Sequence, residues 1–271
     1  MAKSKFRTSE IDALVEQIFE GIITPIELPK NLYLEIAEVL KSGLYQGFNA
    51  DLDTFSSSSL KGTLIGEMRE NIYMFSSAKT FQQTLEMSEA IYEGDRIKPF
   101  SVFNQDAKAI FKKYNNFNLN KTSYLKTEYE TAIGQAQNAE KWANIEVDKN
   151  ILKYLRYNAT IDDRTSKICA SLNGLTLPVD DKRWNTCAPL NHWKCRCNLE
   201  QLDEADLTSK ADANQKFKTA TGLMDDLFKS NPGKTGEVFN KSHPYFSVPK
   251  KYKEHALNNF GLPIPKKDKK K

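Results

Sequence analysis

Every cysteine of this chain lies in one short segment, and that confinement limits what the segment can fold into. The four cysteines fall between Cys169 and Cys197, and His192 lies among them. Their spacing is Cys-x17-Cys-x4-His-x2-Cys-x-Cys. Cys and His ligands saturate a tetrahedral zinc site and leave no position for water, so such a site holds a loop together rather than performing catalysis. We predict a small module stabilised by structural zinc.

The candidate ligands outnumber the four positions of a zinc site. They are Cys169, Cys187, Cys195, Cys197 and, as an alternative ligand, His192. Either all four cysteines bind, or His192 replaces one of the pair Cys195 and Cys197. The spacing lacks the two Cys-x2-Cys halves of a common zinc finger. The competing interpretation is that Cys169 and Cys187 are small buried hydrophobic residues.

The composition indicates a chain with a modest core. Of its 271 residues, 39% are hydrophobic and 27% are charged. No apolar run approaches the roughly 20 residues that cross a bilayer, and the start of the chain lacks the apolar stretch of a signal peptide. We therefore expect no membrane partner and synthesis in a cytoplasm. Clustered cysteines in a cytoplasm bind metal or remain thiols rather than form disulfides.

The positive charge is concentrated in the last six residues. These contain one aspartate and five lysines: Lys266, Lys267, Lys269, Lys270 and Lys271. Their net charge of +4 equals that of the whole chain, so the rest of the chain is close to neutral. Such a tail contacts double-stranded DNA through sequence-independent electrostatics, or it serves only as a solubilising end.

The spacing of hydrophobic residues predicts helices through the first two thirds of the chain. The first starts at a Ser9 cap and ends at Gly21, and the second covers 31–42 and ends at Gly43. Further helices are predicted over 64–75, 80–92, 106–114 and 122–147, with a polar loop over 50–61. The longest has small residues at its centre, which indicates close packing against a helix of this chain or of a partner.

Beyond residue 147 the patterns change to short strands, near 154–161, 175–177 and 198–202, followed by a weaker helix over 208–227. The predicted fold class is therefore α+β and predominantly α-helical. Four segments are expected: 1–55, an N-terminal helical arm; 56–150, a helical body with the long helix; 151–205, an irregular α+β module rich in Cys and Trp; and 206–271, a C-terminal helix with an extended basic tail.

Two further motifs resemble parts of catalytic or phosphate-binding sites. Asp162 and Asp163 form a carboxylate pair, but adjacent residues on a turn usually point apart, so a cap or an ion pair with Arg164 explains Asp163 better. The Gly233-Lys234 pair matches only the end of a phosphate-binding loop and lacks the preceding glycine. Neither motif predicts an enzyme.

One ordered set of motifs between residues 121 and 202 is more specific than any of its parts. It comprises Tyr124-Leu125-Lys126-Thr127-Glu128-Tyr129, Trp142, Asp163-Arg164-Thr165, Leu172-Asn173-Gly174, Trp184 and the run from Ala188-Pro189 to Cys195-Arg196-Cys197. This order resembles the phage Mu F-like family of minor head (head morphogenesis) proteins. Many relatives have a histidine where this chain has Cys169, which keeps a metal ligand, and an aspartate where it has Asn173. The loss of that aspartate argues against a catalytic carboxylate.

The resemblance implies a non-enzymatic minor head protein that takes part in head morphogenesis. It implies the portal protein as anchor, with the major capsid or scaffolding protein as further possible partners. The expected location is inside the capsid near the portal vertex and the packaged DNA, and the host cytoplasm during assembly. The alternative is a metal-dependent nuclease or toxin-like enzyme packaged in the virion. An enzyme would require an open metal site with a carboxylate such as Asp163 near His192.

Overall fold

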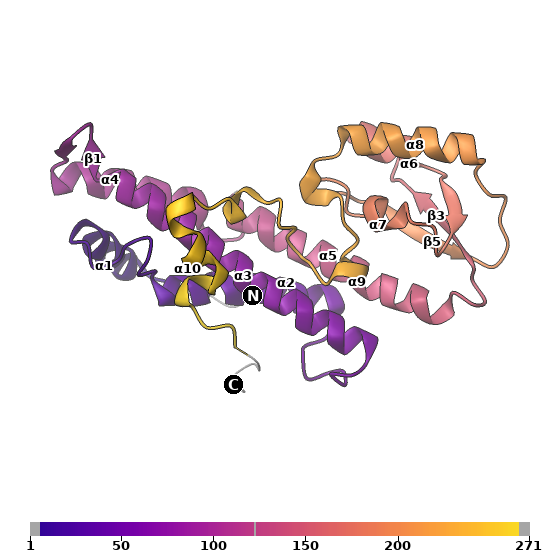
Figure 1. The fold of residues 1–271 in the computed structure, drawn as a ribbon, viewed down its shortest axis with the longest axis horizontal. Coiled ribbons are helices and arrows are strands. Elements are labelled where there is room, and N and C mark those ends of the chain that lie inside the picture. Colours follow the sequence, from indigo (N-terminus) through magenta and orange to yellow (C-terminus); the bar gives the residue numbers. More distant parts are fainter. Residues whose placement is uncertain (1–5, 122, 266–271) are drawn as a thin grey trace. The chain divides into compact units, whose positions relative to one another are not determined.

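The computed structural model describes residues 6–121 and 123–265 (Figure 1). Within them the fold is predominantly α-helical α+β, which confirms the predicted class. The α-helices are α1 (Thr8–Phe19), α2 (Lys30–Phe48), α3 (Leu60–Glu89), α4 (Phe100–Tyr114), α5 (Tyr124–Asp148), α6 (Lys167–Leu172), α7 (Trp184–Cys187), α8 (Lys210–Leu223), α9 (Pro232–Thr235) and α10 (Lys253–Leu257). The strands are β1 (Tyr92–Glu93), β2 (Arg96–Ile97), β3 (Tyr154–Asn158), β4 (Thr176–Pro178) and β5 (Asn198–Leu202).

The described chain divides into two compact units, each built from separate stretches of sequence. The first contains the described parts of 1–43, 69–130 and 243–271, and the second contains 44–68 and 131–242. Helices α2, α3 and α5 therefore each contribute residues to both units. The expected division into four consecutive segments stays a prediction.

The start of the first helix and the end of the second differ from the prediction. Helix α1 starts before Ser9, and the Glu10 side chain accepts a hydrogen bond from the backbone N–H of Arg7. Helix α2 continues through Gly43, where an added Cβ would lie 3.0 Å from Tyr129 of α5. This glycine therefore permits a close helix approach and does not end the helix, because helix packing also selects for small residues.

Helix α3 is a single helix where the sequence indicated two. The predicted gap, 76–79, contains the buried polar residues Ser76 and Ser77, and the buried Thr80 follows it directly. The Ser76 and Thr80 hydroxyls donate to the carbonyl oxygens four residues earlier, each at 2.8 Å. These side chains interrupt the hydrophobic period without interrupting the helix, because their hydrogen bonds are satisfied by the helix itself.

A buried ion pair joins α3 to α5 within the first unit. The Lys79 Nζ lies 2.5 Å from Glu128 Oε2, and the two side chains are 0% and 4% exposed. The Tyr245 hydroxyl also hydrogen-bonds Glu128. The C-terminal segment that contains Tyr245 is further held by the Gln82 amide, which donates to the carbonyl oxygens of Tyr245 and Ser247.

The small residues at the centre of α5 pack against α2, so the expected neighbour belongs to the same chain. An added Cβ on Gly47 would lie 2.4 Å from the carbonyl oxygen of Ile133 and 2.5 Å from the Cβ of Ala136. Only a residue without a side chain allows the two backbones this close. Within the second unit, this contact fixes the part of α5 that faces the cysteine-rich segment.

The cysteine-rich segment surrounds a three-stranded antiparallel sheet in the order β4-β3-β5 (Figure 1). Helices α6 and α8 pack against each other beside it. The core of this part is formed by buried apolar side chains from the sheet, from α5 to α8 and from the loops; its largest members include Trp142, Leu155, Tyr157, Leu175, Trp184 and Phe228. This core fixes the ends of the strands and loops that carry the predicted ligands.

Among the helices formed by residues 6–121 and 123–265, the structure contains none that is long and apolar enough to cross a membrane.

Candidate metal centre

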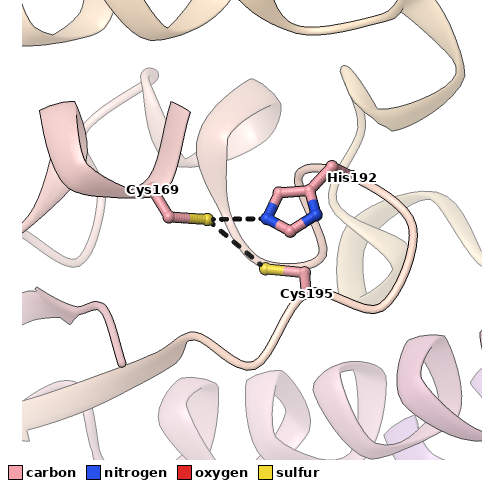
Figure 2. A group of neighbouring side chains, drawn as sticks. All are labelled: Cys169, His192 and Cys195. Atoms are coloured by element: carbon pink, nitrogen blue, oxygen red, sulfur yellow. Dashed lines mark hydrogen bonds between the residues drawn. The ribbon is translucent and has the colours of Figure 1, made fainter. Parts of the chain in front are cut away.

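Three of the predicted ligands come together in one group (Figure 2). The Sγ of Cys169 lies 3.1 Å from His192 Nε2 and 3.7 Å from the Sγ of Cys195. The ligand atoms of all three residues lie within 4.8 Å of one another. Cys169 and Cys195 are buried and His192 is half-buried, so the group is largely shielded from solvent.

Different elements supply the three ligands, and local interactions hold each one. Cys169 lies in the first turn of α6, where its backbone N–H donates to the capping hydroxyl of Ser166. His192 and Cys195 lie in the loop between α7 and β5. That loop packs on α5 at Gly134, where an added Cβ would lie 2.8 Å from the Leu190 side chain. The site therefore joins the start of α6 to the loop that precedes β5.

The separation of the two sulfurs fits a tetrahedral zinc ion. Zinc–sulfur bonds of about 2.3 Å at the tetrahedral angle put two sulfurs about 3.8 Å apart. The observed separation of the Cys169 and Cys195 sulfurs is 3.7 Å. Two thiols and an imidazole are the soft and borderline donors that zinc prefers.

The orientation of His192 also suits metal binding. Its Nδ1 lies 2.8 Å from the carbonyl oxygen of Trp193, so a proton on Nδ1 is donated to that oxygen. This arrangement directs Nε2 at the sulfur group, where a metal ion would take the place of the Nε2 proton (Figure 2). Metal-binding histidines commonly donate the other ring N–H to a backbone carbonyl or a carboxylate in this way.

The electrostatics of the group favour a bound cation. Hydrogen bonds from Cys195 and Cys197, together with His192, hold the pKa of Cys169 below its ordinary value. The hydrogen bond to Cys169 raises the pKa of His192 to about 10. The group therefore carries a thiolate balanced by a protonated imidazole, and a metal ion can replace that proton as the positive partner.

The four predicted cysteines do not all lie in this group. Cys197 is half-buried and packs against Cys169, Cys195 and Leu190. Cys187 instead lies at the end of α7 in the hydrophobic core with Trp184, and its side chain is fully buried. Burial raises the pKa of the Cys187 thiol to about 12. This residue fits the competing interpretation of a small buried hydrophobic residue, whereas Cys169 does not.

The turn at residues 162–165 contacts the loop between Cys195 and Cys197 through the Asp162 carboxylate. The Arg196 guanidinium donates to both carboxylate oxygens of Asp162, at 2.7 and 2.6 Å. This pairing holds the pKa of Asp162 well below its ordinary value of 3.8. The Thr160 hydroxyl donates to the carbonyl oxygen of Arg196, so the turn binds both the side chain and the backbone between Cys195 and Cys197.

Sequence reasoning did not single out Asp162 as the member of the carboxylate pair that makes this contact. Asp163 is exposed. No carboxylate oxygen from residues 6–121 or 123–265 belongs to the Cys169, His192 and Cys195 group. The carboxylate pair therefore shows a positioning role, through one member, and no arrangement for acid–base chemistry.

Sequence reasoning also missed two buried polar residues behind the sulfurs. The Asn191 amide donates to the Tyr157 hydroxyl at 2.8 Å, and this hydroxyl donates to the Cys169 sulfur at 3.5 Å. Tyr157 and Asn191 are both fully buried. A tyrosine in a strand is usually interpreted as part of the core, so only the tertiary structure reveals that Tyr157 contacts the Cys169 sulfur.

Two other predicted features lie away from the centre. Gly233 is buried against Trp142, and Lys234 donates to Asn185 at 2.7 Å, so the Gly-Lys-Thr sequence serves packing. The predicted DNA-contacting lysines, Lys266, Lys267, Lys269, Lys270 and Lys271, lie outside the described residues.

Comparisons with known proteins identify the region that contains this centre. Residues 81–200 match the family described as Phage Mu protein F like protein. The chain is 35% identical over 101 residues to the Mu-like prophage FluMu F protein of Haemophilus influenzae, and 27% identical over 124 residues to the putative capsid assembly protein F of Escherichia phage Mu. No solved structure matches the chain.

These two matches cover 37% and 45% of this chain, and 23% and 28% of the relatives, so the chain spans about a quarter of the length of the curated relatives it matches. The family region starts earlier than the motifs in the sequence indicated and includes the end of α3 and all of α4. It also contains Cys169, His192, Cys195 and Cys197. Residues 81–200 are thus similar to the Phage Mu protein F-like family, and this similarity confirms the resemblance that the order of motifs predicted.

Proposed function

We propose that this protein is a phage minor head protein that takes part in head morphogenesis. The observation that carries the proposal is the family match over residues 81–200, together with a relative named as a putative capsid assembly protein. We further propose that it is anchored at the portal, inside the head and near the packaged DNA. The major capsid and scaffolding proteins are further candidate partners.

We propose that the Cys169, His192 and Cys195 group holds zinc in a structural role. Zinc there would tie α6 to the loop that precedes β5. The support is the donor set, the separation of the two sulfurs and the orientation of His192. Zinc held by these residues and a fourth Cys or His ligand would stabilise the fold and leave no water to activate, so we propose that the protein is not an enzyme.

Particle composition tests the assembly role. Procapsids and mature virions would be purified from infected or induced cells and their proteins quantified by mass spectrometry. We expect this protein in both particles at low copy number, and crosslinks from it to the portal protein. Its absence from both particles would overturn the assembly role, whereas its presence without portal crosslinks would overturn only the proposed anchor.

Metal analysis tests the structural role. Protein purified under reducing conditions should contain about one zinc per chain, and chelation should make the 151–205 region sensitive to protease. A zinc content near zero, after growth with zinc, would overturn the metal proposal. Nuclease activity that is lost in Asp163→Ala would instead support the alternative of a packaged enzyme.

A further inference from the structure

The donor count at the metal centre is incomplete without a fourth residue. Structural zinc is almost always held by four protein ligands. The group of Cys169, His192 and Cys195 supplies three. The remaining cysteines, Cys187 and Cys197, are the soft donors nearest in sequence, and the structure distinguishes between them.

Cys197 lies beside the three ligands. It packs against Cys169 and Cys195, and its thiol interacts with both sulfurs. The Tyr157 hydroxyl contacts Cys197 as well as Cys169. The Cys195 and Cys197 side chains are carried by one loop, and the Asp162–Arg196 pair holds the residue between them. Cys197 is therefore the remaining cysteine that packs directly against the ligand group.

Cys187 is held in a different environment. It is fully buried at the end of α7, among apolar residues of the core that includes Trp184. Its carbonyl oxygen accepts from the Asn191 amide, which fixes the backbone between Cys187 and His192. Bringing the Cys187 sulfur to the metal would require removing it from this core.

We infer that Cys197 is the fourth ligand, so that the metal site is a closed set of Cys169, His192, Cys195 and Cys197 with Cys187 outside it. This inference rests on the metal-binding role proposed above. It replaces both ligand sets that the sequence left open, because each of those included Cys187. A closed Cys3His site has no open position for substrate or water.

Cobalt substitution measures the number of thiolate ligands directly. Reduced, metal-free full-length protein would be titrated with Co²⁺, and the sulfur-to-cobalt charge-transfer band would be recorded for the parent, Cys197→Ser and Cys187→Ala. We expect Cys197→Ser to lose roughly a third of the band intensity, one of three thiolates, and at least about tenfold in affinity. Cys187→Ala should match the parent in both. An unchanged Cys197→Ser, or a Cys187→Ala with the reduced band, would overturn the inference.

Because Cys187 lies in the core, the Cys187→Ala variant can misfold. Thiol labelling of the parent protein therefore provides an independent measurement. Iodoacetamide would be applied to the zinc-loaded and the chelated native protein, and modified cysteines located by mass spectrometry. We expect Cys197 to react only after chelation, and Cys187 to stay unmodified in both states because of its burial. Equal labelling of Cys197 in both states would contradict the inference. A parent protein that binds neither cobalt nor zinc would instead refute the metal proposal itself.

Discussion

The buried pair of Lys79 and Glu128 provides the sharpest test of how the first unit is held together. Neither side chain has more than 4% of its surface exposed, and the charged atoms lie 2.5 Å apart. Burial lowers the pKa of Lys79 and raises the pKa of Glu128, and each charge offsets part of the shift of the other. Each charge is therefore stable in the core only while its partner is present.

Replacing one partner should be far more damaging than replacing both. Glu128→Leu leaves a buried ammonium without a counter-charge, which costs about 3–5 kcal/mol of unfolding free energy. In the double variant Lys79→Met/Glu128→Leu, removal of the pair stabilises by about 1–4 kcal/mol. The Tyr245 hydroxyl loses its acceptor in that variant, which costs about 1–3 kcal/mol. We therefore expect the double variant to lie within about 3 kcal/mol of the parent protein.

Urea unfolding followed by circular dichroism measures these differences. The matched control is Asp12→Asn, which breaks the Lys108–Asp12 pair of similar length, 2.6 Å, whose side chains are 42% and 51% exposed. The control should lose at most about 1 kcal/mol. The reasoning fails if Glu128→Leu costs no more than the control. It also fails if the double variant is destabilised by the sum of the two single changes.

The complementary variant Lys79→Met adds a pH dependence with a defined sign. The Lys79 charge lowers the pKa of Glu128 and so offsets part of the effect of burial. Without it, the pKa of Glu128 rises further above its ordinary value of 4.5. A carboxyl whose pKa is raised in the folded state is stabilising below pH 4.5, and this stability is lost as the pH rises through the folded-state pKa. Lys79→Met should therefore be more stable at pH 4.5 than at pH 7, with a slope of up to about 1.4 kcal/mol per pH unit. A flat profile would contradict it.

Three further predictions concern packing, the metal loop and the tail. Gly47→Ala should destabilise the protein by about 1–3 kcal/mol, because the new Cβ would lie 2.4 Å from a backbone carbonyl oxygen of α5. The control Gly66→Ala has open space around the new Cβ, so in the same unfolding assay it should be neutral or stabilise by up to about 1 kcal/mol. Asp162→Asn should weaken zinc binding by about tenfold in a chelator competition, whereas Asp163→Asn should leave it unchanged; equal effects would refute the positioning role of Asp162. Deleting 266–271 should reduce both the affinity for double-stranded DNA and its salt dependence in a binding titration, and an unchanged salt slope would exclude the tail from DNA contact.

Local patterns in the sequence were sufficient for most of the secondary structure. The long helix, the central strand and the strand at 198–202 were predicted because their hydrophobic periods arise within a few turns of backbone. The errors have a shared cause. Gly43 was interpreted as a helix end, and the polar residues around Ser76 as a gap, because a glycine or a serine has the same local signature whether it ends a helix or packs inside one.

For the metal centre, too, the sequence determined some features and the tertiary structure determined others. The sequence by itself identified the segment, the donor types and the family resemblance. Only the tertiary structure decided that Cys169, His192 and Cys195 meet while Cys187 lies in the apolar core. It also decided that Asp162, and not Asp163, binds Arg196. Spacing limits which residues are able to meet, but which sulfurs face one another depends on how α6, α7 and the loop before β5 pack around the sheet.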